Sequence, residues 1–243
     1  MTRGTPVAVT FGSVASGIDF DLHLPYFADV PLGHWARRFI EGIFVGGVTT
    51  GCGTNPLTYC PDTVTSRWEM AVFLSRAIAG SDAAVPVSGT VPGAGSYDCS
   101  AGGTSLFPSD VPPTDGGCRH VHYIFGREVT AGCAPGSFCP QSETNRWQTA
   151  VFLAVALAGS NAAVPVSGTV PGVGSYDCSP GGTSLFPNDV PPTDGGCRHV
   201  HYIYAQGLTA GCAEGSFCPT TALTRDQMAV FLSKGFHLSS YGT

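Results

Sequence analysis

The sequence predicts a mainly α fold made of three repeated helix–loop–helix units, with long Gly/Pro-rich connectors and a short N-terminal β segment. One loop, bracketed by two cysteines and closed by a proline, occurs three times: TTGCGTNPLTYCP at 49–61, TAGCAPGSFCP at 130–140 and TAGCAEGSFCP at 209–219. Apolar residues spaced i, i+3, i+4 stand beside these loops, and this spacing places them on one helical face. The chain also has 33 glycines and 19 prolines, so much of it must be turn and loop.

The internal repeat sets the domain boundaries. The second copy returns 79 residues later in the third, which matches Cys99 with Cys178, Cys118 with Cys197, Cys133 with Cys212, Cys139 with Cys218 and Arg146 with Arg225. We therefore place unit 1 at 26–80, unit 2 at 105–159 and unit 3 at 184–238. Connectors occupy 81–104 and 160–183, and a C-terminal tail follows at 239–243.

Residues 1–25 precede the repeat and have a different pattern. The stretch VAVTFGSVASGIDF alternates as strands do, so we expect a β-strand segment that forms the end of an upstream β-sandwich module. The start of the chain lacks the continuous apolar run of a secretion signal. We expect either a processed product or, as we favour, a piece of a longer protein.

Each unit repeats the same order of elements. A DVP entry, a first amphipathic helix, the cysteine loop and a second helix follow one another. The entries begin at Asp29, Asp110 and Asp189. The second helices open with SRWE at 66–69, NRWQ at 145–148 and TRDQ at 224–227. Ser, Asn or Thr followed three residues later by Glu or Gln is a capping box, which predicts the start of each second helix.

The ten cysteines recur as sets inside the units, which predicts five local disulfides. We expect the pairs Cys52–Cys60, Cys99–Cys118, Cys133–Cys139, Cys178–Cys197 and Cys212–Cys218. The CxxC knuckles that zinc ribbons need are missing from the sequence. Disulfides persist outside the reducing cytosol, so we expect an extracellular protein.

Charge and motifs exclude several functions. Charged residues make up 12% of the chain, the net charge is −6, and the sequence has no run of Lys or Arg, so nucleic acid and anionic lipid are not expected partners. The sequence has no stretch apolar enough to predict a transmembrane segment. It also has no Gly-x-Ser-x-Gly, His-Glu-x-x-His or phosphate-loop motif, so we expect neither an enzyme nor a cofactor.

Several spaced motifs together resemble the S-layer homology (SLH) domain family. In unit 1 they are FADVP, His34-Trp35-Ala36 and the SRWE helix start. The resemblance covers all three units. It implies a pseudo-threefold bundle of helices whose grooves bind pyruvylated cell-wall polysaccharide and so anchor surface proteins at the cell surface. Units 2 and 3 depart from the pattern, because DGG at 115–117 and 194–196 replaces His-Trp-Ala.

Three arginines are the main candidate binding residues. Arg67, Arg146 and Arg225 each take the first position of a second helix, where the macrodipole disfavours a cation. One explanation is an internal pair with the Asp of a DVP entry. The other is an acidic glycan group, held by the guanidinium and by free N–H donors of the helix N-terminus. With Asp29 and Trp35 as further candidates, we expect unit 1 to have the best groove.

The tryptophans and two His-x-His motifs are the remaining candidates for binding a sugar or a metal. Trp35 is expected to cover a sugar ring, whereas Trp68 and Trp147 are expected to pack between units. The His-x-His of CRHVHY, at 118–123 and 197–202, is not expected to bind metal, because residues two apart point to different sides of a helix. One carboxylate in the DGG turn is too few for Ca²⁺.

Two functions follow from these observations. The first is a non-catalytic cell-surface anchoring module that binds acidic, pyruvylated cell-wall polysaccharide. The alternative is a structural subunit that packs against copies of itself in an extracellular filament or an S-layer-like assembly, in which the N-terminal strand could complete the sheet of a neighbouring copy.

Overall fold

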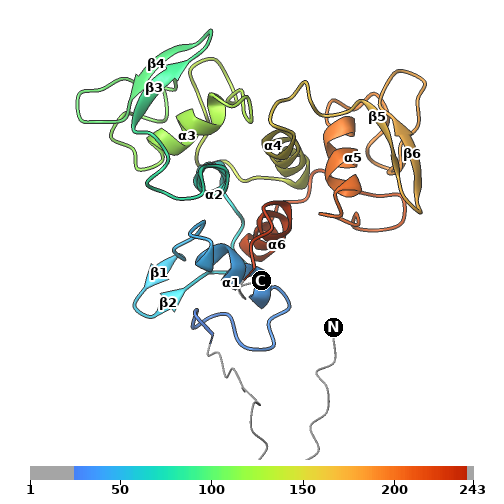
Figure 1. The fold of residues 1–243 in the computed structure, drawn as a ribbon, viewed down its shortest axis with the longest axis horizontal. Coiled ribbons are helices and arrows are strands. Elements are labelled where there is room, and N and C mark those ends of the chain that lie inside the picture. Colours follow the sequence, from blue (N-terminus) through green and yellow to red (C-terminus); the bar gives the residue numbers. More distant parts are fainter. Residues whose placement is uncertain (1–24, 240–243) are drawn as a thin grey trace, which may run out of the picture.

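The computed structural model describes residues 25–239, so the predicted β segment at the N-terminus lies outside the described residues. Within this range the chain forms six helices and three antiparallel two-stranded sheets (Figure 1). The helices are α1 (Arg37–Val45), α2 (Arg67–Ala79), α3 (Cys118–Phe125), α4 (Arg146–Ala158), α5 (Cys197–Ala205) and α6 (Arg225–Gly235). The strands are β1 (Gly53–Thr54), β2 (Leu57–Thr58), β3 (Ser88–Val91), β4 (Gly95–Asp98), β5 (Ser167–Val170) and β6 (Gly174–Asp177).

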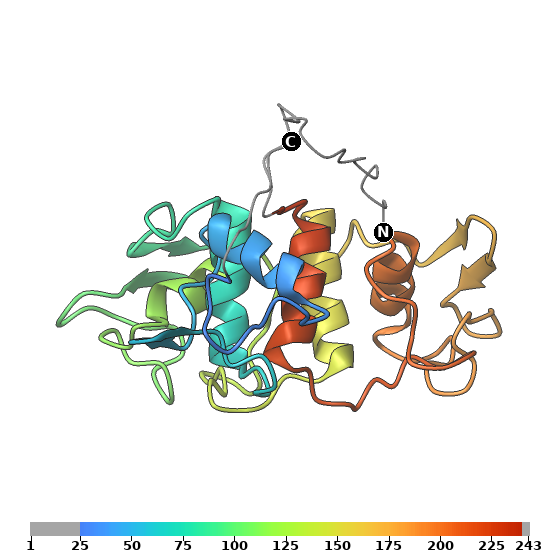
Figure 2. The same ribbon diagram turned by 90° about the horizontal axis from the view of Figure 1, so that it is seen from below.

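The predicted fold class, mainly α with a pseudo-threefold bundle, is wrong, because the protein is a mixture of helices and small sheets. The Gly/Pro-rich connectors, in which no strand was predicted, contain the hairpins β3–β4 and β5–β6, which lie at two outer ends of the molecule (Figures 1 and 2). Their registers pair Ser88 with Asp98 and Ser167 with Asp177. Two strands of four residues each, joined by a turn that contains Pro-Gly, are enough for a hairpin. Their sequence was not recognised as strand because glycine and proline are so frequent in these connectors.

The second helices begin where the sequence predicts. Ser66, Asn145 and Thr224 have extended backbones and form complete capping boxes with the residue three positions later. Two of these helices, α2 and α4, end at Gly80 and Gly159, which have the left-handed conformation (φ of 81° and 86°) that glycine adopts without a steric penalty.

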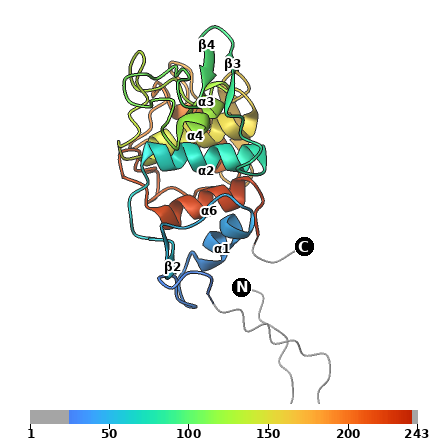
Figure 3. The same cartoon turned by 90° about the vertical axis from the view of Figure 1, so that its left-hand side faces the viewer.

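The sequence repeat is not the packing unit. Helix α3 packs on α2, and α5 packs on α4, so each first helix contacts the second helix of the preceding unit. Helix α1, the first helix of the described residues, packs instead on α6, the last of them (Figure 3). The contact between α1 and α6 therefore joins the beginning of the described chain to its end.

A closed cycle of backbone hydrogen bonds joins the segments that lead into α2, α4 and α6. The amide of Thr65 donates to the carbonyl of Leu223 (2.8 Å), that of Leu223 to Thr144 (2.9 Å), and that of Thr144 to Thr65 (2.8 Å). All three residues are fully buried. The starts of the three second helices are thus fixed relative to one another.

Candidate functional site

The cysteine loops are fixed from two directions. All five predicted disulfides are confirmed. In addition, the entry aspartate of each unit accepts hydrogen bonds from two backbone amides of its own loop. Asp29 accepts from the amides of Tyr59 (2.8 Å) and Cys60 (2.7 Å), and Asp110 and Asp189 do the same in units 2 and 3. These carboxylates therefore hold the loops in place.

The three candidate arginines each cross to the cysteine loop of another unit. The Nε of Arg67 donates to the carbonyl of Phe138 (2.9 Å), and its guanidinium lies over the same phenyl ring at 4.8 Å. Arg146 has the same relation to Phe217, and Arg225 to Tyr59. Each arginine is thus bound by a backbone carbonyl and an aromatic ring of another unit. None of the three bonds directly to the Asp of a DVP entry, as an internal Arg–Asp pair would require.

The N–H donors at the N-termini of the second helices, which were expected to be free to bind an acidic glycan group, already have backbone acceptors. The amide of Arg67 donates to the carbonyl of Ser142 and that of Trp68 to Pro140, both at 2.9 Å. The corresponding amides of α4 donate to Thr221 and Pro219, and those of α6 donate to Thr63 and Pro61. An anion near these helices must therefore bind through side chains.

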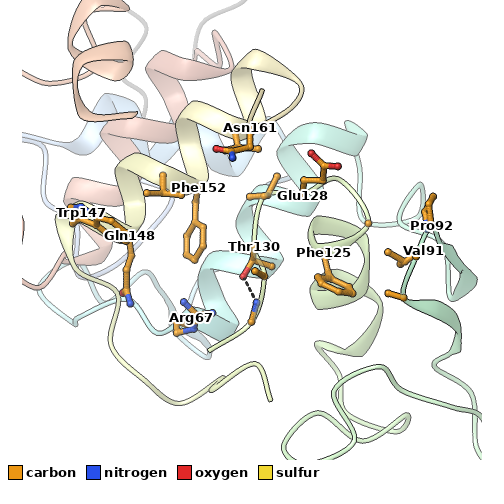
Figure 4. A pocket seen from close by; sticks show the side chains of 18 residues that line it. Arg67, Val91, Pro92, Phe125, Glu128, Thr130, Trp147, Gln148, Phe152 and Asn161 are labelled. Atoms are coloured by element: carbon orange, nitrogen blue, oxygen red, sulfur yellow. Dashed lines mark hydrogen bonds between the residues drawn. The ribbon is translucent and has the colours of Figure 1, made fainter. Parts of the chain in front are cut away.

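A groove of about 800 Å³ lies between the end of α3, the turn that follows it, and α4. Its rim includes Val91 and Pro92 of the β3–β4 turn, and Arg67 lies at its base, with Gln148 extending toward the guanidinium (Figure 4). Apolar side chains form most of the rest of the lining: Ala94, Phe125, Val129, Ala131, Val151, Phe152 and Val155. The groove is therefore a largely apolar cleft whose lining carries one cation, Arg67, and one carboxylate, Glu128 (Figure 4).

The Arg67 guanidinium is buried without a full set of hydrogen bonds and, within the described residues, without a carboxylate bonded to it. Its side chain lies against Phe138 and Phe152, and only 5% of the residue is exposed. Nη2 is buried and has no hydrogen-bond partner among residues 25–239. Burial lowers the pKa of Arg67, although the charge of Asp110 opposes this effect. A desolvated cation that lacks a directly bonded carboxylate favours an anion in the groove.

A matching but much smaller groove, of about 190 Å³, lies in unit 1. Arg225 takes the place of Arg67 there, and Glu69 takes the place of Gln148. A carboxylate oxygen of Glu69 pairs with Nη1 of Arg225. The larger Arg76 stands where unit 2 has Val155, and its Nε donates to Asp82 at 2.7 Å. In unit 1 the charge of the cation is therefore already paired, although Nη2 of Arg225, like that of Arg67, is buried and has no hydrogen-bond partner among residues 25–239.

The structure does not bring Trp35, Asp29 and Arg67 into one groove. Trp35 is 61% exposed and lines a separate hollow of about 180 Å³ with Leu32, His34 and Arg38. Trp68 and Trp147 are half-buried instead and donate from Nε1 to Asp115 (2.9 Å) and Asp194 (2.8 Å) of the next unit. These two bonds agree with packing between units, although Trp147 also lines the large groove.

The histidines of CRHVHY have structural partners. His122 shares a hydrogen bond at Nδ1 with the carbonyl of Cys118 (2.7 Å), accepts at Nε2 from the amide of Leu106 (2.9 Å), and stacks on Tyr97. His201 has the equivalent contacts in unit 3. The nearby cysteine sulfurs are consumed by the disulfides, so these groups serve packing.

One serine–histidine–aspartate cluster was not anticipated. Ser75 Oγ lies 2.7 Å from Nδ1 of His120, and Nε2 of His120 lies 3.4 Å from Asp82. The composition is that of a catalytic triad, but Ser75 is fully buried and its hydroxyl also bonds the carbonyl of Val72. A nucleophile must reach substrate, so we assign this cluster to the contact between α2 and α3.

The five disulfides fit an extracellular protein. None of the helices in residues 25–239 is long and apolar enough to cross a membrane. The chain matches no protein-family model, and the search of curated proteins found no relative.

Proposed function

We propose that this chain is a non-catalytic cell-surface anchoring module that binds an acidic cell-wall polysaccharide in the groove of Arg67. The observation that supports this most directly is the buried guanidinium at the base of a large groove, with an Nη2 that no group of the described chain satisfies. The resemblance to SLH domains supports the same class of ligand.

The lining of the groove indicates the kind of acidic group. Arg67 is the one cation in the lining, whose other side chains are mainly apolar apart from Glu128, Thr130, Gln148 and Asn161, so the ligand should combine a carboxylate for Arg67 with an apolar surface. A pyruvate ketal on a sugar has both, since it carries a carboxylate and a methyl group on one carbon. Its carboxylate would meet Arg67, and its methyl group and the sugar ring would lie against Phe152 and Val129.

Binding to two matched polysaccharides tests this proposal. One sample is a pyruvylated polysaccharide purified from bacterial cell walls, and the other is the same material after mild acid has removed the ketals. We expect the chain to sediment with the first only. Arg67→Gln should weaken binding by about 1.5–3 kcal/mol, the range of a charge-assisted hydrogen bond. Equal binding of both samples, or of neither, contradicts the proposal.

Arg146→Gln is the matched control variant. Arg146 makes the same crossing contact to a neighbouring loop, so its loss perturbs the fold in the same way but leaves the large groove intact. Melting curves of both variants, followed by circular dichroism, separate a change of binding from a change of folding.

A structural subunit of an assembly is the second candidate. Leu32 and Trp35 are exposed by 62% and 61% and lie together at the entry of α1, so they form an apolar patch. Such a patch favours contact with another copy. Sedimentation velocity of the chain and of Trp35→Ser distinguishes this candidate, because self-association that depends on Trp35 supports the assembly.

A further inference from the structure

Units 1 and 2 contain two grooves built to the same plan. A threonine, a phenylalanine and an arginine from another unit recur in both, as Thr49, Phe73 and Arg225 in the first and as Thr130, Phe152 and Arg67 in the second. In both, the arginine donates from Nε to a loop carbonyl and lies over two aromatic rings. The two grooves therefore share one plan, although that of unit 1 is much smaller (about 190 Å³ against about 800 Å³) and contains Arg76 where unit 2 has Val155.

Glu69 sets the unit 1 groove apart. Its Oε2 accepts from the amide (2.9 Å) and the hydroxyl (3.1 Å) of Ser66, so the capping box fixes the carboxylate in place. The other oxygen, Oε1, pairs with Nη1 of Arg225, whose side chain is only 3% exposed. A negative charge thus stands against the guanidinium where a ligand's carboxylate would have to bind.

Gln148 completes the same cap without a charge. Its Oε1 accepts from the amide of Asn145 (3.3 Å), and the side chain of Asn145 accepts from the amide of Gln148 (2.8 Å). Exchanging Glu for Gln at this position therefore keeps the cap of the helix and removes only the carboxylate. Arg67 consequently has no ion-pair partner in the part of the chain that the structure describes.

We propose that Glu69 occupies the unit 1 groove in place of an anionic ligand, so that the residue at this position of the capping box determines whether the unit 1 groove can bind as the unit 2 groove does. This inference rests on the proposed function, because Glu69 would direct a carboxylated glycan to Arg67 by occupying the other arginine. Position 69 then excludes the ligand from unit 1, and Gln148 admits it to unit 2.

Unit 3 also has a glutamine, Gln227, at this position of its capping box, so another feature must distinguish it from unit 2. Its base residue, Arg146, donates from Nη2 to Oγ1 of Thr209 (3.3 Å), and the buried Asp226 replaces Trp147 of unit 2. The Arg146 guanidinium therefore has a second internal partner, and a buried carboxylate stands where unit 2 has the indole of Trp147. We expect one binding site per chain.

Calorimetric titration with a pyruvylated methyl hexoside tests the inference, with the non-pyruvylated hexoside as the control ligand. The wild-type chain should bind one molecule, and Glu69→Gln should bind two. Gln148→Glu should weaken the wild-type site at least tenfold, because it restores the Arg–Glu pair. Both exchanges keep the capping box, so melting temperatures should stay close to that of the wild type.

Two further variants assign the sites. In the Glu69→Gln background, Arg225→Gln should remove the added site, and Arg67→Gln should remove the original one. An unchanged stoichiometry in Glu69→Gln, or wild-type binding that depends on Arg225, overturns the inference while leaving polysaccharide binding intact. A wild-type chain that binds neither hexoside overturns the proposed function and the inference together.

Discussion

The indole nitrogen of Trp68 donates a hydrogen bond to the carboxylate of Asp115, 47 residues away, at 2.9 Å. Trp147 and Asp194 repeat this relationship in the next pair of units. At the contact between α6 and α1 both members of the pair change, since Asp226 stands in the place of the tryptophan and His34 in the place of the aspartate. Unit 1 alone thus has His-Trp-Ala where the other units have DGG.

The second glycine of the DGG turn makes room for the indole. A methyl group added at Gly117 would lie 2.2 Å from Nε1 of Trp68. We expect Gly117→Ala to lower the free energy of unfolding by about 1–3 kcal/mol, the usual cost of overpacking. Urea unfolding provides the measurement.

Gly116→Ala is the matched control for this prediction. The nearest atom to an added methyl group at Gly116 is 3.9 Å away, which is an ordinary contact. Its stability should remain close to that of the wild type. Equal losses for the two variants would show that the backbone of the turn, and not the indole, is the cause.

Two buried hydroxyls lie in the hydrogen-bonded cycle at the starts of the second helices. Oγ1 of Thr65 and Oγ1 of Thr144 have no hydrogen-bond partner within residues 25–239. Valine has the same shape without the polar group, and the third member of the cycle is already Leu223. We expect Thr65→Val and Thr144→Val each to stabilise the fold by about 1 kcal/mol. A decrease in the thermal midpoint would contradict this prediction.

The buried histidines make stability depend on pH. Burial, followed by the charges of Arg119 and Arg76, lowers the pKa of His120 from 6.5 to about 4, although Asp82 opposes the shift. Burial and then Arg198 lower the pKa of His199 to about 4. Between these values and 6.5 the unfolded chain binds more protons than the folded chain, so stability falls as the pH falls.

The contribution of each histidine is therefore complete above pH 6.5 and is lost as the pH falls toward about 4. Each contributes a slope of up to about 1.4 kcal/mol per pH unit. Unfolding free energies measured from pH 4 to 7 check this, with His199→Gln expected to have a shallower slope. A variant with the wild-type slope would assign the effect to other groups.

The disulfide Cys99–Cys118 joins the β3–β4 hairpin to the start of α3. It closes a loop with a sequence separation of 19, against 8 for Cys52–Cys60. Loop-closure entropy predicts a loss of about 3.3 kcal/mol for Cys99→Ser with Cys118→Ser, and about 2.6 kcal/mol for the pair in unit 1. Denaturant unfolding of both double variants gives the two values, and a larger loss for the shorter loop would contradict the order.

Local signals in the sequence predicted local structure well. The capping boxes at Ser66, Asn145 and Thr224 and the five disulfides depend on residues close in the chain, and all are confirmed. The hairpins of the connectors were missed, because their short strands lie in stretches rich in glycine and proline. The fold class was wrong for this reason.

The candidate site was only partly predictable, because it depends on which unit contacts which. The three arginines were found from their unfavourable helix position, but their loop partners belong to other units. Trp35 was grouped with Arg67 because both belong to unit 1 in sequence, and the helix pairing separates them. Glu69 and Gln148 were noted only as capping residues. The change from a charged to a neutral residue at this repeat position is visible in the sequence and could have indicated that the two units differ.

The cycle through Thr65, Thr144 and Leu223 has a consequence for how this protein can evolve. In an open solenoid, a repeat can be gained or lost because each one contacts only its neighbours and the two ends carry special caps. Here α1 packs on α6, so each end of the array serves as the cap of the other. A fourth unit would find no unoccupied end, and two units would leave one amide and one carbonyl of the cycle unpaired. The copy number is therefore set by geometry, and the cycle closes only with three units.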